Sequence, residues 1–154
     1  MENIRYAVRV FAFQDNKVVC IKYKKINQGY LDIPGGKIED GETEIDACKR
    51  EFIEETGMTI NDLTCIGTTE VIYPELNKKF VLKTYVANQV SGEPQDFDEN
   101  ESFWLPINQL RNENKRYAVT HLLDEEMMHY FKFGKLNITF ICDSNHNIIS
   151  SKMN

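Results

Sequence analysis

Three glutamates near the middle of the chain are the first candidates for chemistry. Glu51, Glu54 and Glu55 lie in a segment whose pattern predicts a helix over residues 43–55. Positions three and four apart stack on one helix face, so these carboxylates are expected to repel one another, at roughly a few tenths of a kcal/mol per pair. Mg²⁺ or Mn²⁺ would remove that repulsion, because hard cations prefer carboxylate oxygens. A solvated acidic face is the simpler alternative, and the three glutamates alone favour it.

The residues around these glutamates favour the metal site instead. Pro34-Gly35-Gly36 stands between a predicted strand and a loop, where glycine lets the backbone approach a ligand closely. Asp40-Gly41-Glu42-Thr43 places a turn and polar groups where a helix begins. Arg50 stands beside Glu51, and its planar guanidinium suits a carboxylate. The segment therefore combines acidic ligands with an arginine that can orient them.

The elements that must position this segment are mixed strands and helices. Ile45, Cys48 and Phe52 form an apolar stripe that should dock the helix on a sheet, and Gly57 is a plausible C-terminal cap. Residues 6–13 and 18–23 predict an N-terminal hairpin, and residues 136–142 and 148–149 a closing hairpin. Further strands are expected at 31–33, 63–72, 79–88 and 103–106, and helices at 107–110 and 119–131. This irregular order favours an α+β domain around one mixed sheet.

Length and charge limit the class of protein. The chain of 154 residues, 42% of them hydrophobic, predicts one domain over residues 1–154. Its net charge is −6 at pH 7, which disfavours long nucleic acid because phosphate strands are held by clustered Lys and Arg. Small phosphorylated ligands remain compatible, since a bound divalent cation supplies positive charge.

Cysteine use and the N-terminus predict a soluble, cytoplasmic protein. The four cysteines lie far apart without a CxxC pair, which favours buried free thiols in a reducing compartment. No signal-peptide pattern opens the sequence, and no apolar run reaches membrane-spanning length. Histidines 121, 129 and 146 have no paired spacing for a metal and are interpreted as ordinary surface or core residues.

Between Gly36 and Met58 the sequence resembles the Nudix box. That pattern is Gly, five residues, Glu, seven residues, Arg-Glu-apolar, one residue, Glu-Glu, one residue, Gly-apolar. Every constrained position is present, with both spacers of the right length: Gly36, Glu42, Arg50, Glu51, Phe52, Glu54, Glu55, Gly57 and Met58. A chance match at nine fixed positions is improbable, and the resemblance extends to the N-terminal hairpin, Pro-Gly-Gly, and an acidic loop before Trp104.

The resemblance to Nudix hydrolases implies a fold, a cofactor and a site. The fold is a mixed β-sheet sandwiched between helices, with a loop-helix-loop catalytic motif. The implied reaction is Mg²⁺-dependent hydrolysis of a nucleoside diphosphate linked to X, with Mn²⁺ as a substitute and no covalent intermediate. The implied metal ligands are Glu51, Glu54, Glu55 and the backbone carbonyl of Gly35. Arg50 would orient these carboxylates, and Glu42 would complete the loop.

The general base is expected in the acidic loop that precedes Trp104, by the same resemblance. Glu99 is the first candidate and Asp98 the second, whereas Glu101 is expected on the following strand. A solvated surface loop without a catalytic role is an equally open interpretation, because acidic loops are common.

The substrate is left open between classes. MutT-like hydrolysis of an (oxidised) nucleoside triphosphate to a monophosphate and pyrophosphate is favoured by the short chain and by Gly92-Glu93-Pro94 before Trp104. Pro74, sixteen residues after the box, has a spacing associated with ADP-ribose or nucleotide-sugar pyrophosphatases, although a hairpin loop often contains proline. A catalytically silent Nudix-like ligand sensor is the alternative of a different class. By family analogy a homodimer is possible.

Aromatic residues could contribute to substrate binding. Tyr23, Tyr30, Tyr73 and Phe80 are candidates for stacking on a base. Aromatic residues at strand positions are more often core or cross-strand partners, so none of the four is singled out.

Overall fold

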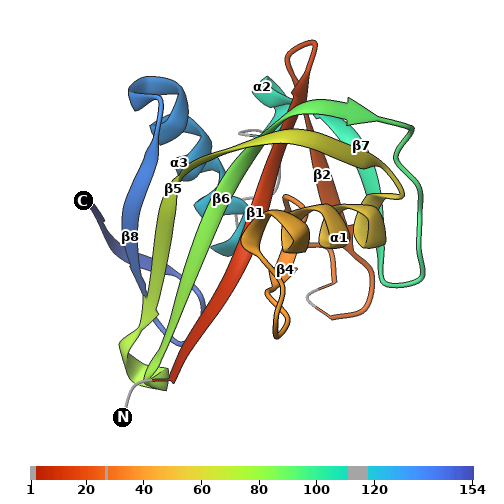
Figure 1. Ribbon diagram of the computed structural model, residues 1–154. Coiled ribbons are helices and arrows are strands. Elements are labelled where there is room, and N and C mark those ends of the chain that lie inside the picture. Colours follow the sequence, from red (N-terminus) through yellow and green to blue (C-terminus); the bar gives the residue numbers. More distant parts are fainter. Residues whose placement is uncertain (1–2, 27, 111–117) are drawn as a thin grey trace.

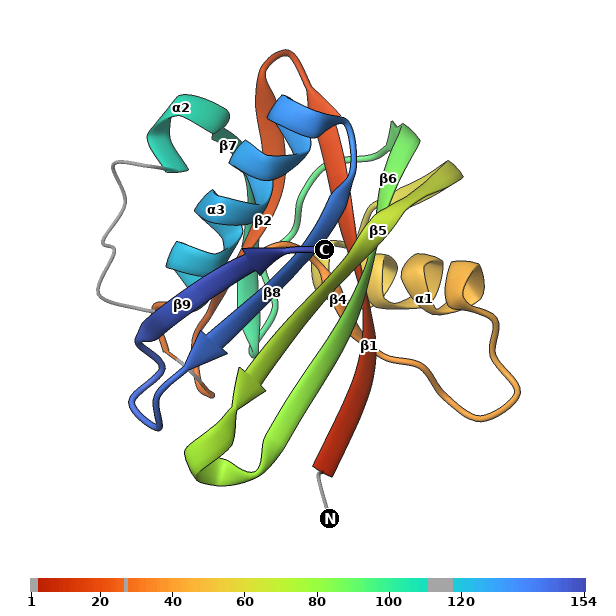
Figure 2. The same cartoon turned by 90° about the vertical axis from the view of Figure 1, so that its left-hand side faces the viewer.

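The computed structural model describes residues 3–26, 28–110 and 118–154, and within these ranges no side chain is described at residues 110 and 118–121. Its strands form one bent mixed sheet, with helix α1 on one side and α3 on the other (Figures 1 and 2). This confirms the predicted α+β class and the sandwich of a mixed sheet between helices. The elements are β1 (Asn3–Gln14), β2 (Lys17–Tyr23), β3 (Leu31–Asp32), β4 (Gly35–Lys37), α1 (Glu44–Thr56), β5 (Thr59–Tyr73), η1 (Pro74–Leu76), β6 (Lys78–Ser91), β7 (Asn100–Pro106), α2 (Ile107–Leu110), α3 (Ala118–Phe133), β8 (Leu136–Cys142) and β9 (Ile148–Met153).

Strand β1 is an interior strand of the sheet, between β2 and β6, and its long partner is β6. The two run parallel from the pair Asn3–Lys78 to the pair Ala12–Ala87. The predicted N-terminal hairpin forms only at its turn, because β1 and β2 pair only at Phe13–Val18 and Gln14–Lys17. Beyond that point the short strand β4 takes the same edge of β1, and β2 pairs with β3 and β7 instead.

The alternation of side chains along β1 separates the interior into two cores. Val8, Val10 and Ala12 pack with Cys48 and Phe52 of α1. Phe11 points to the other side, where it belongs to a core shared with α3. Arg9 has the same orientation as Phe11, so β1 directs one charged side chain towards α3.

Helix α1 begins and ends as predicted. Thr43 accepts a hydrogen bond from the backbone N–H of Asp46, and Gly57 adopts a left-handed conformation with φ of 74°. The predicted apolar stripe is correct for Cys48 and Phe52, which are fully buried, but wrong for Ile45, which is 42% exposed. Ile45 lies in the first turn of the helix, before the turns that pack on the sheet.

Strand β4, the cysteines and the helices differ in how well they match the expectations from the sequence. Strand β4 was not predicted, because Pro34-Gly35-Gly36 was expected between the end of a strand and a loop. None of the four cysteines, all of which lie in the described ranges, forms a disulfide, but Cys65 is exposed, contrary to the expectation of buried thiols. In the described part of the chain, no helix is long and apolar enough to cross a membrane.

Gly67, the single glycine of β5, is predicted not to tolerate a side chain. It lies at a register irregularity with φ of 139°, and an added Cβ would overlap the carbonyl oxygen of Leu136 in β8. Gly67→Ala should therefore lower the free energy of unfolding by more than about 2 kcal/mol. Gly134→Ala is the matched control, since Gly134 has φ of 73° but open space around it, and should cost only about 1 kcal/mol. Equal losses in urea denaturation would contradict this account of the β5–β8 contact.

Candidate active site

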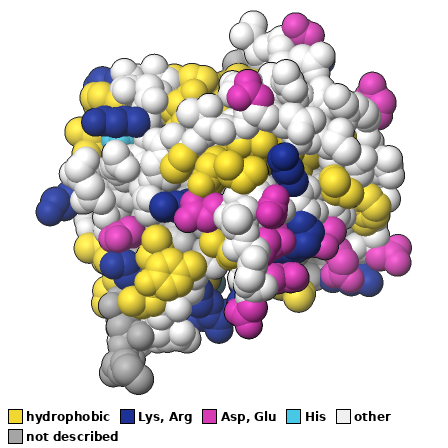
Figure 3. All heavy atoms as spheres, in the orientation of Figure 1, with side chains coloured by type: hydrophobic (Ala, Val, Ile, Leu, Met, Phe, Trp, Pro, Cys, Tyr) yellow, Lys and Arg dark blue, Asp and Glu magenta, His cyan; other side chains and the backbone are white. Residues whose placement is uncertain are grey.

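Arg50 joins the loop before α1 to the helix itself. Its Nε and Nη2 donate to the two carboxylate oxygens of Glu42, at 2.7 and 2.9 Å, and Nη2 also donates to the carbonyl of Lys37. Its Nη1 donates to Glu51 at 2.8 Å and, more weakly, to Glu54 at 3.4 Å. These hydrogen bonds hold the pKa of Glu42 at about 2. The arginine therefore orients carboxylates of the box, as the sequence indicated, and Figure 3 shows acidic and basic side chains gathered over this region.

Glu51 lies directly against the backbone of Gly36. A Cβ added to Gly36 would come within 2.5 Å of the Glu51 carboxylate. Burial raises the pKa of Glu51, the bonds to Arg50 lower it, and the charge of Glu54 raises it again, with a net shift upwards. The glycine at this position of the box is therefore required by space, because any side chain would displace a carboxylate.

Glu55 is the most buried of the three box carboxylates. Its Oε1 accepts a hydrogen bond from the backbone N–H of Gly35 at 2.9 Å. Burial, followed by the negative charges of Glu51 and Asp32, raises the pKa of Glu55 to about 8 despite that bond. No positive charge is among the causes of this shift, so the negative charge of an ionised Glu55 is not compensated.

The donor set fits a divalent cation. Glu51 and Glu55 are partly buried and share too much negative charge, and Glu54, 57% exposed at its side chain, stands beside them on the solvent side. Within the described residues no three acidic, histidine or cysteine side chains already converge as a metal site. Binding would therefore require Glu54 to turn towards its neighbours, a rotation that an exposed side chain can make at little cost.

The acidic loop before β7 is attached to α1 next to the box carboxylates. Asn100, the residue after Glu99, donates from its side chain to the carbonyl of Glu55 at 2.8 Å. The Glu99 carbonyl accepts from the backbone of Lys24, and the Glu99 carboxylate lies 3.5 Å from Lys25. Glu99 itself is 69% exposed at its side chain. Glu101 lies on β7 opposite Lys22, as predicted.

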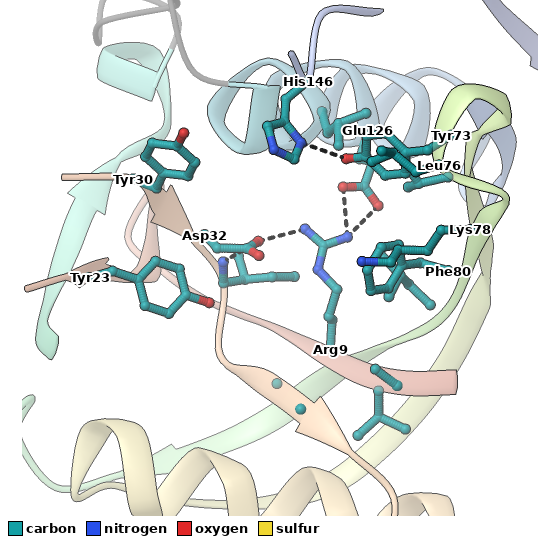
Figure 4. Close-up of a pocket in the computed structure, with 18 residues that line it drawn as sticks. Arg9, Tyr23, Tyr30, Asp32, Tyr73, Leu76, Lys78, Phe80, Glu126 and His146 are labelled. Carbon is teal, nitrogen blue, oxygen red and sulfur yellow. Dashed lines mark hydrogen bonds and ion pairs between the residues drawn. The ribbon is translucent and has the colours of Figure 1, made fainter. Parts of the chain in front are cut away.

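A cavity of about 340 Å³ opens beside α1 and is lined by Gly35 and Gly36 (Figure 4). The four aromatic residues that the sequence left unresolved all line it: Tyr23, Tyr30, Tyr73 and Phe80. Burial, followed by the charges of Asp32 and Glu55, raises the pKa of Tyr23, so this ring lies between the cavity and the box. The cavity therefore has stacking surfaces, and Gly35 and Gly36, which line it, contact Glu55 and Glu51 of α1.

Charged residues of the cavity were missed from the sequence. Arg9, Asp32 and Glu126 line it together, and His146 reaches it from the β8–β9 turn with Nδ1 3.2 Å from the Tyr73 hydroxyl. His146 was expected to be an ordinary surface or core residue, and its side chain is exposed. The side chain of histidine 121 lies outside the described residues. A signal existed for Arg9, since a charge inside an apolar strand requires a buried partner.

Comparisons with known proteins agree with this geometry. The profile of the NUDIX domain family matches residues 3–128. An oxidized purine nucleoside triphosphate hydrolase from Danio rerio is 29% identical over 130 residues, which is 80% of this chain and 83% of that protein. An 8-oxo-dGTP diphosphatase from Buchnera aphidicola is 30% identical over 95 residues, 62% of this chain and 75% of that protein.

Solved structures share the fold. A MutT protein from Bacillus halodurans superposes with a TM-score of 0.80 over 97% of each chain at 20% identity. A MutT NUDIX hydrolase from Burkholderia pseudomallei gives a TM-score of 0.63 over 70% of this chain and 86% of its own, at 27% identity. With the complete box and its arginine-held carboxylates, the family match shows that this chain belongs to the NUDIX domain family and is a MutT-like Nudix hydrolase.

Proposed function

We propose that the protein is a Mg²⁺-dependent pyrophosphohydrolase of purine nucleoside triphosphates, oxidised ones included. The products are a nucleoside monophosphate and pyrophosphate. The observation that carries this proposal is the aromatic cavity that shares Gly35 and Gly36 with the carboxylates of α1. A base stacked in the cavity would leave its phosphates beside those carboxylates, and a cavity of about 340 Å³ suits one nucleoside.

The metal would be held by Glu51, Glu54, Glu55 and the carbonyl of Gly35. Bound Mg²⁺ supplies positive charge for the phosphoryl oxygens and acidifies the attacking water. Arg50 keeps Glu51 in place through its 2.8 Å bond, and Glu42 fixes Arg50 from the other side. Arg50 and Glu42 thus hold the carboxylate of Glu51 in place before the substrate binds. Such positioning supplies much of the catalysis in phosphoryl transfer.

The proton of the attacking water requires a base. We assign this role to Glu99, with Asp98 as the second candidate. The water oxygen bonds to one phosphorus of the α–β linkage and the bridging P–O bond breaks. The leaving group is pyrophosphate when the α-phosphorus is attacked and the nucleoside monophosphate when the β-phosphorus is attacked, and the water proton passes to the carboxylate. The bond from Asn100 to Glu55 supports the assignment, because it attaches the loop to the end of α1.

The comparisons favour triphosphates over ADP-ribose. Relatives named as oxidized purine nucleoside triphosphate hydrolase or 8-oxo-dGTP diphosphatase come from Danio rerio and Buchnera aphidicola. Pro74 begins the short helix η1 between β5 and β6, a position at which its fixed φ is structurally useful. The presence of a proline at this spacing from the box is therefore explained by the turn and is no evidence for an ADP-ribose-type substrate. The cytoplasmic location and the homodimer stay predictions.

A substrate panel tests the proposal directly. The protein with Mg²⁺ is incubated with dGTP, 8-oxo-dGTP, dATP, ADP-ribose and a nucleotide sugar, and products are separated by chromatography. We expect monophosphate and pyrophosphate from a purine triphosphate, and none after removal of the metal with EDTA. Preferential cleavage of ADP-ribose would replace the proposal with a sugar-nucleotide pyrophosphatase. Tight binding without cleavage of any compound would identify a ligand sensor.

Loss of one box carboxylate should abolish most turnover while the fold remains. In Glu54→Gln and Glu55→Gln the amide replaces a metal ligand, and kcat should fall by about 100-fold or more. The Gln at position 55 can still accept the Gly35 N–H, so thermal unfolding should be unchanged. Glu125→Gln, an exposed change on α3, is the control. Rates near those of the unmodified protein in either box variant would remove that residue from the metal site.

Glu99→Gln tests the proposed base. Because general bases contribute about 10²- to 10⁴-fold, kcat should fall by that order while KM stays constant. The rise of kcat with pH should also flatten, since the carboxylate that must lose its proton is gone. Asp98→Asn and Glu101→Gln are compared in parallel, and Glu101 on β7 should tolerate the change. If Glu99→Gln retains full kcat and Asp98→Asn loses it, the base is Asp98. If both variants retain full kcat, the loop is only a solvated surface.

A further inference from the structure

The acidic loop before β7, which carries both candidate bases, is attached twice to the end of α1. The backbone N–H of Gln95 donates to the carbonyl of Thr56 at 2.9 Å. The side chain of Asn100 donates to the carbonyl of Glu55 at 2.8 Å. Figure 1 shows the connection between β6 and β7 running past the C-terminal end of α1. One side of the loop is therefore fixed to the helix that carries the box carboxylates.

A lysine at the end of β2 holds the same loop from the other side. Lys24 donates its backbone N–H to the carbonyl of Glu99 at 2.9 Å, which extends the pairing of β2 with β7 by one residue. Its Nζ donates to the carbonyl of Phe97 at 2.8 Å. A single residue thus binds the main chain immediately before Asp98 and again at Glu99, so the short segment that bears both carboxylates is held at both ends.

The loop also closes on itself between these attachments. The backbone N–H of Phe97 donates to the carbonyl of Asn100 at 2.8 Å, and the hydroxyl of Ser102 donates to the carbonyl of Gln95 at 2.6 Å. Asn100 and Ser102 are buried, whereas the side chains of the two candidate bases are exposed. The buried side chains of the loop therefore serve as its attachments, and its carboxylates extend from an exposed turn.

The two neighbouring lysines make different contacts with the loop. Nζ of Lys25 lies 3.5 Å from the carboxylate of Glu99, and both of these side chains are more than half exposed. An ion pair between two exposed side chains contributes little, because water screens it. Nζ of Lys24 instead binds a main-chain carbonyl. Lys24 therefore sets the position of the main chain from which both carboxylates extend.

We propose that Lys24 is a positioning residue of the reaction, which holds residues 97–99 so that the base carboxylate stays within reach of the attacking water. This inference rests on the proposed function and on its assignment of the base to Glu99 or Asp98. A base accepts a proton only at hydrogen-bonding distance, and a displacement of about 1 Å can lower the rate by about 100-fold. Release of the loop should therefore slow proton transfer.

Replacement of the ammonium group tests this role. Lys24→Met keeps the backbone N–H and the apolar stem but loses the donor to Phe97, so kcat for dGTP should fall by about tenfold while KM stays constant. Lys24→Arg supplies a donor again and should recover most of the loss. Lys135→Met, an exposed change between α3 and β8, is the control and should leave kcat unchanged. A raised KM with unchanged kcat would overturn the inference, since Lys24 would then bind the substrate.

A double variant shows whether Lys24 acts through the base. Lys24→Met is combined with whichever of Glu99→Gln and Asp98→Asn lowers kcat on its own. Because a residue that only positions the base has nothing left to position, the second substitution should lower kcat no further. If the two falls in kcat multiply, Lys24 acts independently of the base and the inference is overturned.

Hydrogen exchange provides a measurement that does not depend on turnover. The backbone N–H of Phe97, which closes the loop, is followed by NMR in the unmodified protein and in the variants at Lys24. Lys24→Met should exchange this proton faster, and Lys24→Arg should restore the slower rate. A fall in kcat without faster exchange would overturn the inference, because the loss would not arise from the loop.

The two proposals fail in different ways. Hydrolysis of a purine triphosphate at the same kcat by the unmodified protein and by Lys24→Met would overturn the inference while the proposed function stands. Faster exchange in Lys24→Met, without hydrolysis of any compound of the substrate panel by the unmodified protein, would overturn the proposed function and leave Lys24 as an attachment of the loop.

Discussion

Crowding of negative charge on one helix is the constraint on which the site depends. Glu51, Glu54 and Glu55 stand within five residues, and two of them are partly buried against the sheet. Arg50 offsets part of this charge by bonding to Glu51 and to Glu42. The raised pKa of Glu55, about 8, marks the charge that is left uncompensated. In the proposed function, a bound cation would offset this remaining negative charge.

A second buried charge system lies on the other side of β1. Here Arg9 lies between Asp32 and Glu126 and is buried, whereas the carboxylates of α1 are partly exposed to solvent. In this group two carboxylates face one guanidinium. Both systems depend on β1, because alternate side chains of this strand face α1 and α3. Gly35 and Gly36 lie between them, in a strand that pairs with Arg9 and Val8. One strand thus lies between the aromatic cavity and the carboxylates of α1.

Features governed by local contacts were predictable. The cap at Thr43, the end at Gly57 and the contact of Arg50 with Glu51 follow from spacings of a few residues along one helix. Features governed by distant partners were not. β1 pairs in parallel with β6 over most of its length, and the predicted hairpin with β2 forms only at the turn. The edge of β1 that β2 leaves unpaired is occupied by the glycines of β4. Ile45 matched the apolar periodicity but lies where the sheet does not cover α1.

The sequence by itself determined the family, the box and the helix that carries its carboxylates, because nine constrained residues within one loop and one helix interact at short range. Only the tertiary structure decided the aromatic cavity beside the box. Three charged residues that line it, Arg9, Asp32 and Glu126, come from β1, β3 and α3. Because Arg9 and Glu126 lie 117 residues apart, no local sequence pattern predicts their contact. The tertiary structure likewise placed four aromatic residues that are far apart in the sequence around one cavity: Tyr23, Tyr30, Tyr73 and Phe80. These residues come together because burial of side chains in the folded chain, and not their proximity in the sequence, determines which of them are neighbours.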